Sequence, residues 1–174
     1  LQTCKDLVLI GCLTGLRFSD WGRLTKVVKI PMMNGKKVDA IKIRSRKEDS
    51  FIELPVFALM KEIYERYGNS FPKPTSNTNF NNDFKEIGRL LEWDETYYKR
   101  ITRIEKEYEE KPFYEMLSSH CCRRAFCTNS FKAGIPVPTI MDLSGHDSEE
   151  SFYKYIKRRS QSVDIYYDAM EAAY

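Results

Sequence analysis

The sequence predicts a mainly α-helical domain with a small three-stranded antiparallel sheet, that is, an α+β fold. Two observations lead to this prediction. Apolar residues recur at helical spacing through most of the chain, whereas positions 27–54 are β-rich and alternate in the manner of strands. At 174 residues, with no internal repeat and no low-complexity segment, the chain has the size of one domain with a sizeable core.

The first elements are two helices joined by a tight connection. Apolar residues at helical spacing predict a helix over residues 3–13, and Gly15 follows it as a typical helix terminator. Ser19 is suited to cap a short second helix that runs to Leu24. Arg17 would then lie in the turn between the two helices, a good position from which to present a side chain.

The sheet is predicted next. Residues 27–30 are β-rich, and Asn34-Gly35 is a strong turn signal. Residues 38–46 alternate between the two faces of a second strand, and residues 51–54 form the returning strand. Lys47 is expected in the last turn of this three-stranded sheet.

The rest of the chain is predicted to be helical, apart from a loop rich in Pro, Ser, Thr and Asn at 69–79 and one segment without a clear pattern. Residues 95–116 alternate charged and aromatic side chains and fit either a hairpin or a helix. The expected helices are bounded by Ser, Gly or Pro residues. They span residues 57–67, 80–93, 120–132, 136–143, 148–156 and 160–174.

The composition excludes some classes of protein. Charged residues make up 30% and hydrophobic residues 42% of the chain, which is ordinary for a globular domain. No apolar run is long enough for a transmembrane helix, and the start of the chain does not resemble a signal peptide. A net charge of +3 permits nucleic-acid binding without arguing for it.

The cysteines indicate neither a disulfide framework nor a zinc site. Their number is odd, at five, and Cys121 and Cys122 are adjacent, which fits neither kind of spacing. We expect reduced thiols that pack as small apolar side chains. The chain begins at Leu1 rather than at a methionine, so we expect it to be part of a longer protein.

Both histidines of the chain lie in one region with an arginine and a tyrosine. His120 and Arg123 would share a helix face, because they are three residues apart. A guanidinium binds phosphate oxygens in a bidentate manner, and an imidazole can donate to the same phosphate or move a proton near neutral pH. Taken alone this spacing is weak, because a surface pair gives the same pattern.

His146 follows Gly145 where two predicted helices meet, and Tyr155 comes nine residues later. A histidine at the start of a helix is placed to meet a ligand, although a packed, hydrogen-bonded histidine is the more common case. A tyrosine becomes a nucleophile only when its phenol loses its proton during attack and the charge of the phosphate is neutralised. Each of these residues alone therefore says little.

Five blocks in a fixed order are far more specific. They are Thr14-Gly15-Leu16-Arg17-Phe18-Ser19-Asp20, Lys47 before residues 51–55, Ser118-Ser119-His120-Cys121-Cys122-Arg123-Arg124, Leu143-Ser144-Gly145-His146-Asp147, and Tyr155-Ile156. In this order the chain resembles the catalytic domain of the tyrosine recombinase (phage-type integrase) family. The resemblance spans nearly the whole chain and is greatest to integrases of bacterial conjugative transposons and related mobile elements.

The resemblance implies DNA integration and site-specific DNA recombination, in which strands are cut and rejoined through a 3′-phosphotyrosyl intermediate. Tyr155 is implied to be the nucleophile that attacks the scissile phosphate and frees a 5′-hydroxyl. Arg17 and Arg123 would hold the non-bridging oxygens and stabilise the transition state. His146 would hydrogen-bond the phosphate, at a position where some members have tryptophan.

Three further residues receive roles from the same resemblance. Lys47 is implied to be the general acid for the leaving 5′-oxygen, and His120 to assist proton transfer near the nucleophile. Asp20 would support the site by hydrogen bonding. No metal, ATP or other cofactor is implied, because the phosphotyrosine conserves the phosphodiester energy and two arginines neutralise the charge.

The chain departs from the usual family pattern at the HxxR block. Many members have histidine directly after the second arginine, where this chain has Arg124, and small residues where it has Cys121-Cys122. Tyr153 is close enough to compete as nucleophile, but the spacing from His146 favours Tyr155.

Basic residues near the site are candidates for contacts with DNA phosphates, and ordinary solvated faces explain them equally well. They are Lys42, Arg44, Arg46 and Lys157.

The resemblance also sets expectations for the whole protein. Residues 1–174 would form the catalytic domain alone, without the N-terminal core-binding domain that clamps the other side of the duplex. The complete protein would work on double-stranded DNA as a homotetramer on paired sites, in the bacterial cytoplasm and associated with the nucleoid. Two alternatives stay open: relaxation of supercoiled DNA in the manner of a type IB topoisomerase, and a non-catalytic DNA-binding domain of the same fold.

Overall fold

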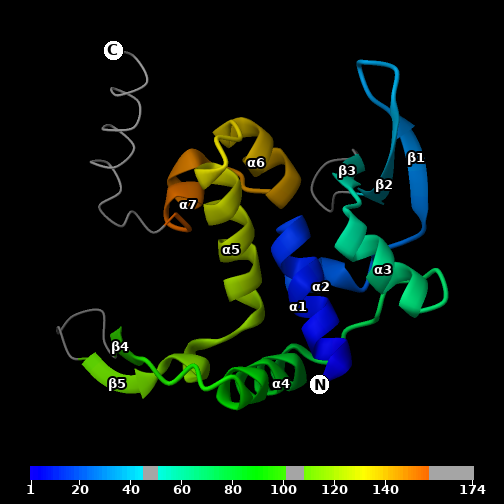
Figure 1. Ribbon diagram of the computed structural model, residues 1–174. Coiled ribbons are helices and arrows are strands. Elements are labelled where there is room, and N and C mark those ends of the chain that lie inside the picture. Colours follow the sequence, from blue (N-terminus) through cyan, green and yellow to red (C-terminus); the bar gives the residue numbers. More distant parts are fainter. Residues whose placement is uncertain (45–50, 101–107, 157–174) are drawn as a thin grey trace, which may run out of the picture.

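The structure is a computed structural model that describes residues 1–44, 51–100 and 108–156 (Figure 1). Two helices form its centre, α1 (Gln2–Thr14) and α5 (Ser119–Lys132), which pack against each other. The prediction of a mainly helical fold with one three-stranded antiparallel sheet is confirmed. Among the helices that the structure describes, none is long and apolar enough to cross a membrane. All five cysteines are free thiols.

The connection after α1 is tighter than predicted. Gly15 ends α1 in the left-handed conformation, with φ 66°, as expected of a terminating glycine. The next helix, α2 (Phe18–Trp21), is only one turn long and already contains Ser19, so Ser19 does not cap it. Its N-cap residue is Arg17, whose backbone is extended. The fully buried Trp21 explains the early start, because it anchors the whole turn in the core.

The three-stranded sheet is antiparallel, as predicted. It consists of β1 (Val27–Pro31), β2 (Lys37–Arg44) and β3 (Phe51–Pro55), with β2 in the centre. Ile41 and Ile43 of β2 face the core, and all pairings are antiparallel. Lys47 belongs to the segment that connects β2 to β3, which lies outside the described residues.

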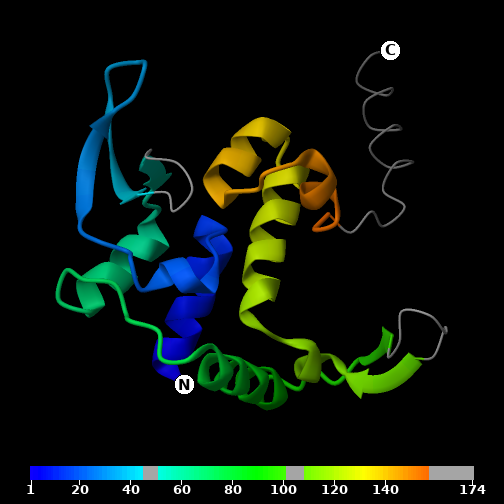
Figure 2. The ribbon, with the colours of Figure 1, turned by 180° about the vertical axis from the view of Figure 1, so that it is seen from behind.

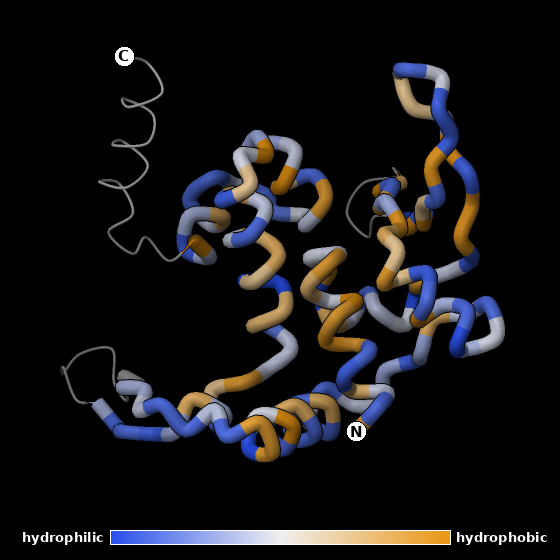
Figure 3. The backbone as a smooth tube through the Cα atoms, viewed as in Figure 1, coloured by the Kyte–Doolittle hydropathy of each residue, from blue (hydrophilic) through white to orange (hydrophobic). Residues whose placement is uncertain are grey.

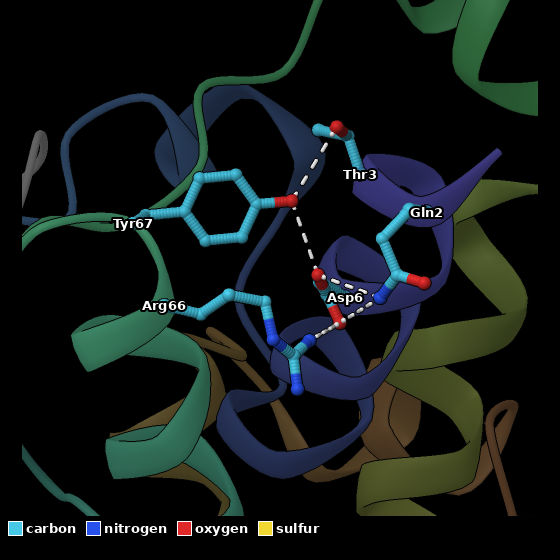
Figure 4. Close-up of polar contacts among 5 residues, drawn as sticks. All are labelled: Gln2, Thr3, Asp6, Arg66 and Tyr67. Atoms are coloured by element: carbon cyan, nitrogen blue, oxygen red, sulfur yellow. Dashed lines mark hydrogen bonds and ion pairs between the residues drawn. The ribbon is translucent and has the colours of Figure 1, made fainter.

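The next helix, α3 (Ala58–Arg66), buries Met60 and Ile63, whereas Leu59 is 40% exposed. A cluster around the buried Asp6 ties α3 to α1 (Figure 4). Burial alone would raise the pKa of the Asp6 carboxyl, but hydrogen bonds from Gln2, Arg66 and Tyr67 lower it below its usual value.

The helix α4 (Asn77–Leu90) begins three residues before its predicted start at position 80. The Ser76 hydroxyl accepts a hydrogen bond of 3.1 Å from the Asn79 backbone N–H, which caps the helix there. The helix ends at Leu90, three residues before its predicted end at position 93, and Leu91 is exposed. The loop expected at 69–79 is correspondingly shorter.

Residues 95–116, which fit two interpretations, form a hairpin followed by one 3-10 turn. The strands β4 (Thr96–Arg100) and β5 (Tyr108–Pro112) pair only with each other, and η1 (Phe113–Met116) leads back to α5. The hairpin extends from the end of α4, on the side of the molecule away from the three-stranded sheet (Figures 1 and 2). It is more hydrophilic than the central helices (Figure 3).

Two short helices, α6 (Val137–Ser144) and α7 (Glu149–Tyr153), pack at the end of α5. A small separate core holds them there; its buried members are Cys127, Ile140, Phe152 and Ile156. The helix predicted over 148–156 ends early, so Tyr155 lies in the turn after α7 rather than on a helix. The Tyr155 N–H bonds to the carbonyl of Phe152, three residues back, which is a turn contact. The helix predicted at 160–174 lies outside the described residues.

Close packing at Gly11 sets the distance between α1 and its neighbours. A Cβ atom built at this position would lie 2.4 Å from Cζ2 of the buried Trp21 and 2.9 Å from Cβ of Cys122. Gly11→Ala is therefore expected to lower the free energy of unfolding by about 1–3 kcal/mol through overpacking, measured by urea denaturation.

Gly22 offers a matched control for this substitution. Its added Cβ would meet only Pro74, at 3.9 Å, and its backbone is right-handed. Gly22→Ala is expected to be neutral or slightly stabilising. Equal stabilities of the two alanine variants would contradict the tight α1 packing.

Candidate active site

The predicted catalytic side chains that the structure describes converge at one place. It lies where the end of α1 and the α6–α7 junction meet α5. Four separate segments of the chain contribute to it. The side chains are Arg17, His120, Arg123, His146 and Tyr155. Lys47, the sixth predicted member, lies outside the described residues.

The Tyr155 ring is the centre of this cluster. Its centroid lies 4.7 Å from that of the His120 ring and 4.6 Å from that of the His146 ring. The Cζ atoms of Arg123 and Arg124 lie 5.7 Å and 5.8 Å from the same centroid. The turn after α7 therefore holds this phenol among two imidazoles and two guanidinium groups. The guanidinium groups are cations that are attracted to the face of an aromatic ring.

Arg123 is almost completely buried, at 3% exposure, and joins two helix ends. Its Nη1 donates to the carbonyl of Gly15, at 2.8 Å, and to that of Ser144, so it satisfies backbone groups at the ends of α1 and α6. Burial, followed by the charge of Arg17, lowers the pKa of Arg123 from its usual value. Its buried Nε has no hydrogen-bond partner among the described residues, and is a donor available to a ligand.

Arg17 reaches the same place from the opposite side. Its Nη2 donates to the carbonyl of Gly145 at 2.9 Å, and Nη2 of Arg123 lies 3.4 Å from the same oxygen. Gly145 is left-handed, with φ 67°, which turns the chain from α6 toward His146. Unlike Arg123, Arg17 is exposed, so its guanidinium can meet a ligand from solvent.

His146 is oriented by Ser144, a residue that the motif analysis did not single out. The buried Ser144 hydroxyl donates to the carbonyl of Ile140 at 2.6 Å and lies 2.7 Å from Nδ1 of His146. Nη2 of Arg123, which can only donate, lies 3.3 Å from the same Nδ1, so a serine hydroxyl and a guanidinium together fix the plane of the imidazole. Nε2 is buried and has no hydrogen-bond partner among the described residues.

The imidazole of His146 is expected to titrate with a pKa of about 4 in the DNA-free protein. Burial is the main cause, and the positive charges of Arg123 and Arg17 add to it. A phosphate held between these groups supplies the opposite charge, so its binding is expected to raise this pKa. NMR titration of the two histidine signals, with and without a short DNA duplex at low salt, measures both values.

The lowered pKa of His146 also predicts how the stability of the fold depends on pH. Between pH 6.5 and about 4 the unfolded chain binds more protons at His146 than the folded chain does. The free energy of unfolding is therefore expected to fall as the pH is lowered through this interval. A duplex that binds without moving the pKa of His146 would contradict a phosphate site at this imidazole.

Two hollows adjoin the cluster. The larger, of about 580 Å³, lies between α2, the strands β2 and β3, and α6. The smaller, of about 410 Å³, is lined by Arg17, His120, Arg123 and Tyr155 among others. Arg17 borders both, so one guanidinium reaches either space. Within the ranges that the structure describes, no three His, Cys, Asp or Glu side chains form a group that could hold a metal ion.

Asp20 lies on α2 and lines the larger of the two hollows. Its carboxylate accepts a hydrogen bond of 3.1 Å from Nη1 of Arg23. Nη2 of Arg23 donates to the backbone carbonyl of Arg44. These contacts tie α2 to the last residue of β2, directly before the segment that contains Lys47.

The predicted DNA-contacting residues are only partly described. Lys42 and Arg44 are both exposed on β2, and Lys42 forms an ion pair of 2.7 Å with Glu53. Arg46 and Lys157 lie outside the described residues. The described pair therefore presents basic groups on the strand that leads toward the site.

Comparison with known proteins adds independent information. A sequence model described as the phage integrase family matches residues 3–162. The fold is similar to that of the integrase of transposon Tn1549 in complex with transposon right end DNA, with a TM-score of 0.59 and 14% identity over 98% of this chain and 59% of that chain. It is also similar to XerA recombinase, with a TM-score of 0.59 and 14% identity over 97% of this chain and 63% of that chain.

The chain thus spans about six tenths of the length of the solved structures it matches. At these identities the likeness is one of fold. No curated protein matches the chain.

Proposed function

The chain belongs to the phage integrase family, the tyrosine recombinases, and from this premise we propose that it is the catalytic domain of a site-specific DNA recombinase. It cuts and rejoins DNA strands through a 3′-phosphotyrosyl intermediate, without metal or ATP. Its substrate is double-stranded DNA at the ends of a mobile element, as a conjugative transposon has. The DNA-bound state of the Tn1549 integrase supports the choice of substrate.

A single observation carries the proposal: Arg17, His120, Arg123 and Tyr155 line one hollow, where the Tyr155 ring packs against the rings of His120 and His146. Neutralising a phosphodiester needs positive charge on its non-bridging oxygens, and bidentate guanidinium groups supply it. Arg17, exposed, and Arg123, with its unpartnered Nε, offer donors to these oxygens. His146 presents Nε2 to the same phosphate.

The chemical step follows from this arrangement. The Tyr155 oxygen attacks phosphorus, and its proton passes to His120, whose ring packs on the Tyr155 ring. A new bond forms between phosphorus and the tyrosine oxygen, while the bond to the 5′-oxygen breaks. The 5′-oxygen leaves with a proton from Lys47, which is the general acid in this proposal. Rejoining reverses each transfer.

The remaining parts of the proposal concern DNA and assembly. Lys42, Arg44, Arg46 and Lys157 contact backbone phosphates and so contribute affinity without sequence preference. In the whole protein an N-terminal core-binding domain clamps the opposite face of the duplex, and four protomers act on two paired sites. Asp20 keeps α2 in place beside the β2–β3 turn.

Covalent capture from a pool of DNA tests the function without knowledge of the target site. The chain is incubated at low salt with nicked duplexes whose central sequence is randomised. After cleavage beside the nick, the strand with the freed 5′-hydroxyl dissociates, so rejoining is blocked. An adduct that survives denaturation, is removed by protease and is enriched in one sequence supports the proposal.

Other outcomes decide against it. Relaxation of supercoiled plasmid with no enriched sequence would indicate a type IB topoisomerase activity. Binding of the pool without any adduct would indicate a non-catalytic DNA-binding domain. Sequencing of the captured strands also gives the cleavage position, because the phosphotyrosyl link marks the 3′ end.

A further inference from the structure

Arg124 is a charged neighbour of the nucleophile to which the proposed chemistry gives no role. It follows Arg123 on α5, and its exposed side chain places Cζ 5.8 Å from the centroid of the Tyr155 ring. Arg123, by contrast, is buried and bonded to the backbone carbonyls of Gly15 and Ser144. The two adjacent guanidinium groups therefore meet the same ring from different environments.

Arg124 is also one helical turn from His120. Positions 120 and 124 are four residues apart on α5, so the two side chains are neighbours on its surface. The His120 ring packs on Tyr155 with a centroid distance of 4.7 Å and an interplanar angle of 56°. Arg124 and His120 thus both reach from α5 to the Tyr155 ring in the turn after α7.

The charges that face His120 are positive. Arg123 and Arg124 approach it from its own helix, and Arg17 from the α1–α2 connection, where it lines the same hollow as His120. The turn after α7 contributes Tyr155, and the α6–α7 junction contributes His146. Partial burial, then Arg124, then Arg123 lower the pKa of His120, so a neutral imidazole predominates near neutral pH.

We propose that Arg124 is a positioning residue for strand cleavage, whose guanidinium holds the Tyr155 ring and keeps His120 in the neutral form that accepts the phenolic proton. In that transfer the O–H bond of Tyr155 breaks, an N–H bond forms on His120, and the tyrosine oxygen bonds to phosphorus as the 5′-oxygen leaves with a proton from the general acid. The inference rests on the proposed recombinase function, and it concerns a position where many family members have histidine.

The first test does not depend on DNA cleavage. The chain has only two histidines, so its NMR spectrum contains two imidazole titrations, and a His146→Asn variant assigns them. Arg124→Gln is expected to raise the pKa of His120 toward its ordinary value, whereas Arg124→Lys, which keeps the charge, leaves it nearly unchanged. Lys132→Gln removes one charge from the far end of the same helix and is expected to have no effect.

The second test is the pH profile of adduct formation on the DNA captured from the randomised pool. Loss of Arg124 moves the acid limb of the profile to higher pH, because more His120 is protonated in weak acid. The rate of Arg124→Gln, taken relative to the wild-type rate at the same pH, is expected to be about threefold lower at about pH 6 than at about pH 8. Arg124→Lys is expected to restore the wild-type profile. A purely structural contact would lower the rate equally at all pH values.

The outcomes separate the two proposals. If the wild-type chain forms adduct and Arg124→Gln leaves its pH profile unchanged, the role of Arg124 is refuted and the recombinase assignment stands. An unchanged pKa of His120 in Arg124→Gln refutes it as well. If the wild-type chain forms no adduct at any pH, the recombinase function fails and the positioning role fails with it. Each variant is expected to unfold at the same urea concentration as the wild-type chain, because position 124 is exposed.

Discussion

Tyr155→Phe is expected to abolish the covalent DNA adduct, with a loss on the order of 10⁴-fold or more, as for removal of an enzyme nucleophile. The substitution deletes one oxygen and keeps the ring. The ring packing on His120, His146 and the two arginines is made by the aromatic system and persists in the variant, which loses only the hydrogen bond between the phenol and Arg123. Folding and DNA binding are therefore expected to be unchanged. Denaturing gels of the captured substrate measure the adduct, and gel shifts measure binding.

Tyr153→Phe is the matched control. This neighbouring tyrosine is 38% exposed, and its ring packs on Phe152 instead of on the histidines. It is expected to retain full adduct formation. Adduct in the Tyr155→Phe protein, or its loss in the Tyr153→Phe protein, would refute the assignment of the nucleophile.

Arg123→Ala is expected to have two large effects at once. Cleavage should fall below detection, because the variant lacks a donor to the phosphate oxygens. The free energy of unfolding should also fall by about 2–4 kcal/mol, since the buried carbonyls of Gly15 and Ser144 lose their hydrogen-bond partner. Urea denaturation at neutral pH measures the second effect, and the adduct assay measures the first.

Arg17→Ala separates chemistry from stability. Arg17 is exposed, and the hydrogen bond described for it goes to the single carbonyl of Gly145. Its loss is expected to reduce cleavage by about 10²–10³-fold, as for removal of one transition-state donor, while stability changes by less than about 1 kcal/mol. Equal stability losses for the two arginine variants would contradict the different burial of the two side chains.

Most helices were predictable because their apolar residues repeat at helical spacing. The ends of the helices were less predictable, because capping contacts set them. The Ser76 hydroxyl, for example, caps α4 so that it begins at Asn77, three residues before the predicted start. The segment 95–116 stayed undecided because charged and aromatic residues alternate in a way that both a hairpin and a helix allow. Tyr155 was expected on a helix, but α7 ends at Tyr153 and a turn carries the tyrosine.

The order of the motifs predicted which side chains come together. Four of them, Arg17, His120, Arg123 and Tyr155, line one hollow, and the fifth, His146, packs against the Tyr155 ring. Ser144 was missed, although it directly precedes Gly145-His146, because its contact with Nδ1 depends on the end of α6. The carbonyl acceptors of the arginines could not be found from sequence, since every residue type has a carbonyl.

The two bonds from Nη1 of Arg123 to the helix ends have a consequence for how this site evolves and can be engineered. A positive charge at the C-termini of α1 and α6 is favourable for both helices, whether or not DNA is present. In a library of variants selected only for soluble expression, Arg123 should therefore be retained, whereas substitutions should accumulate at Arg17. An inactivated descendant of such a recombinase would keep the buried arginine long after the exposed one was lost, so Arg123 alone is a poor indicator of activity.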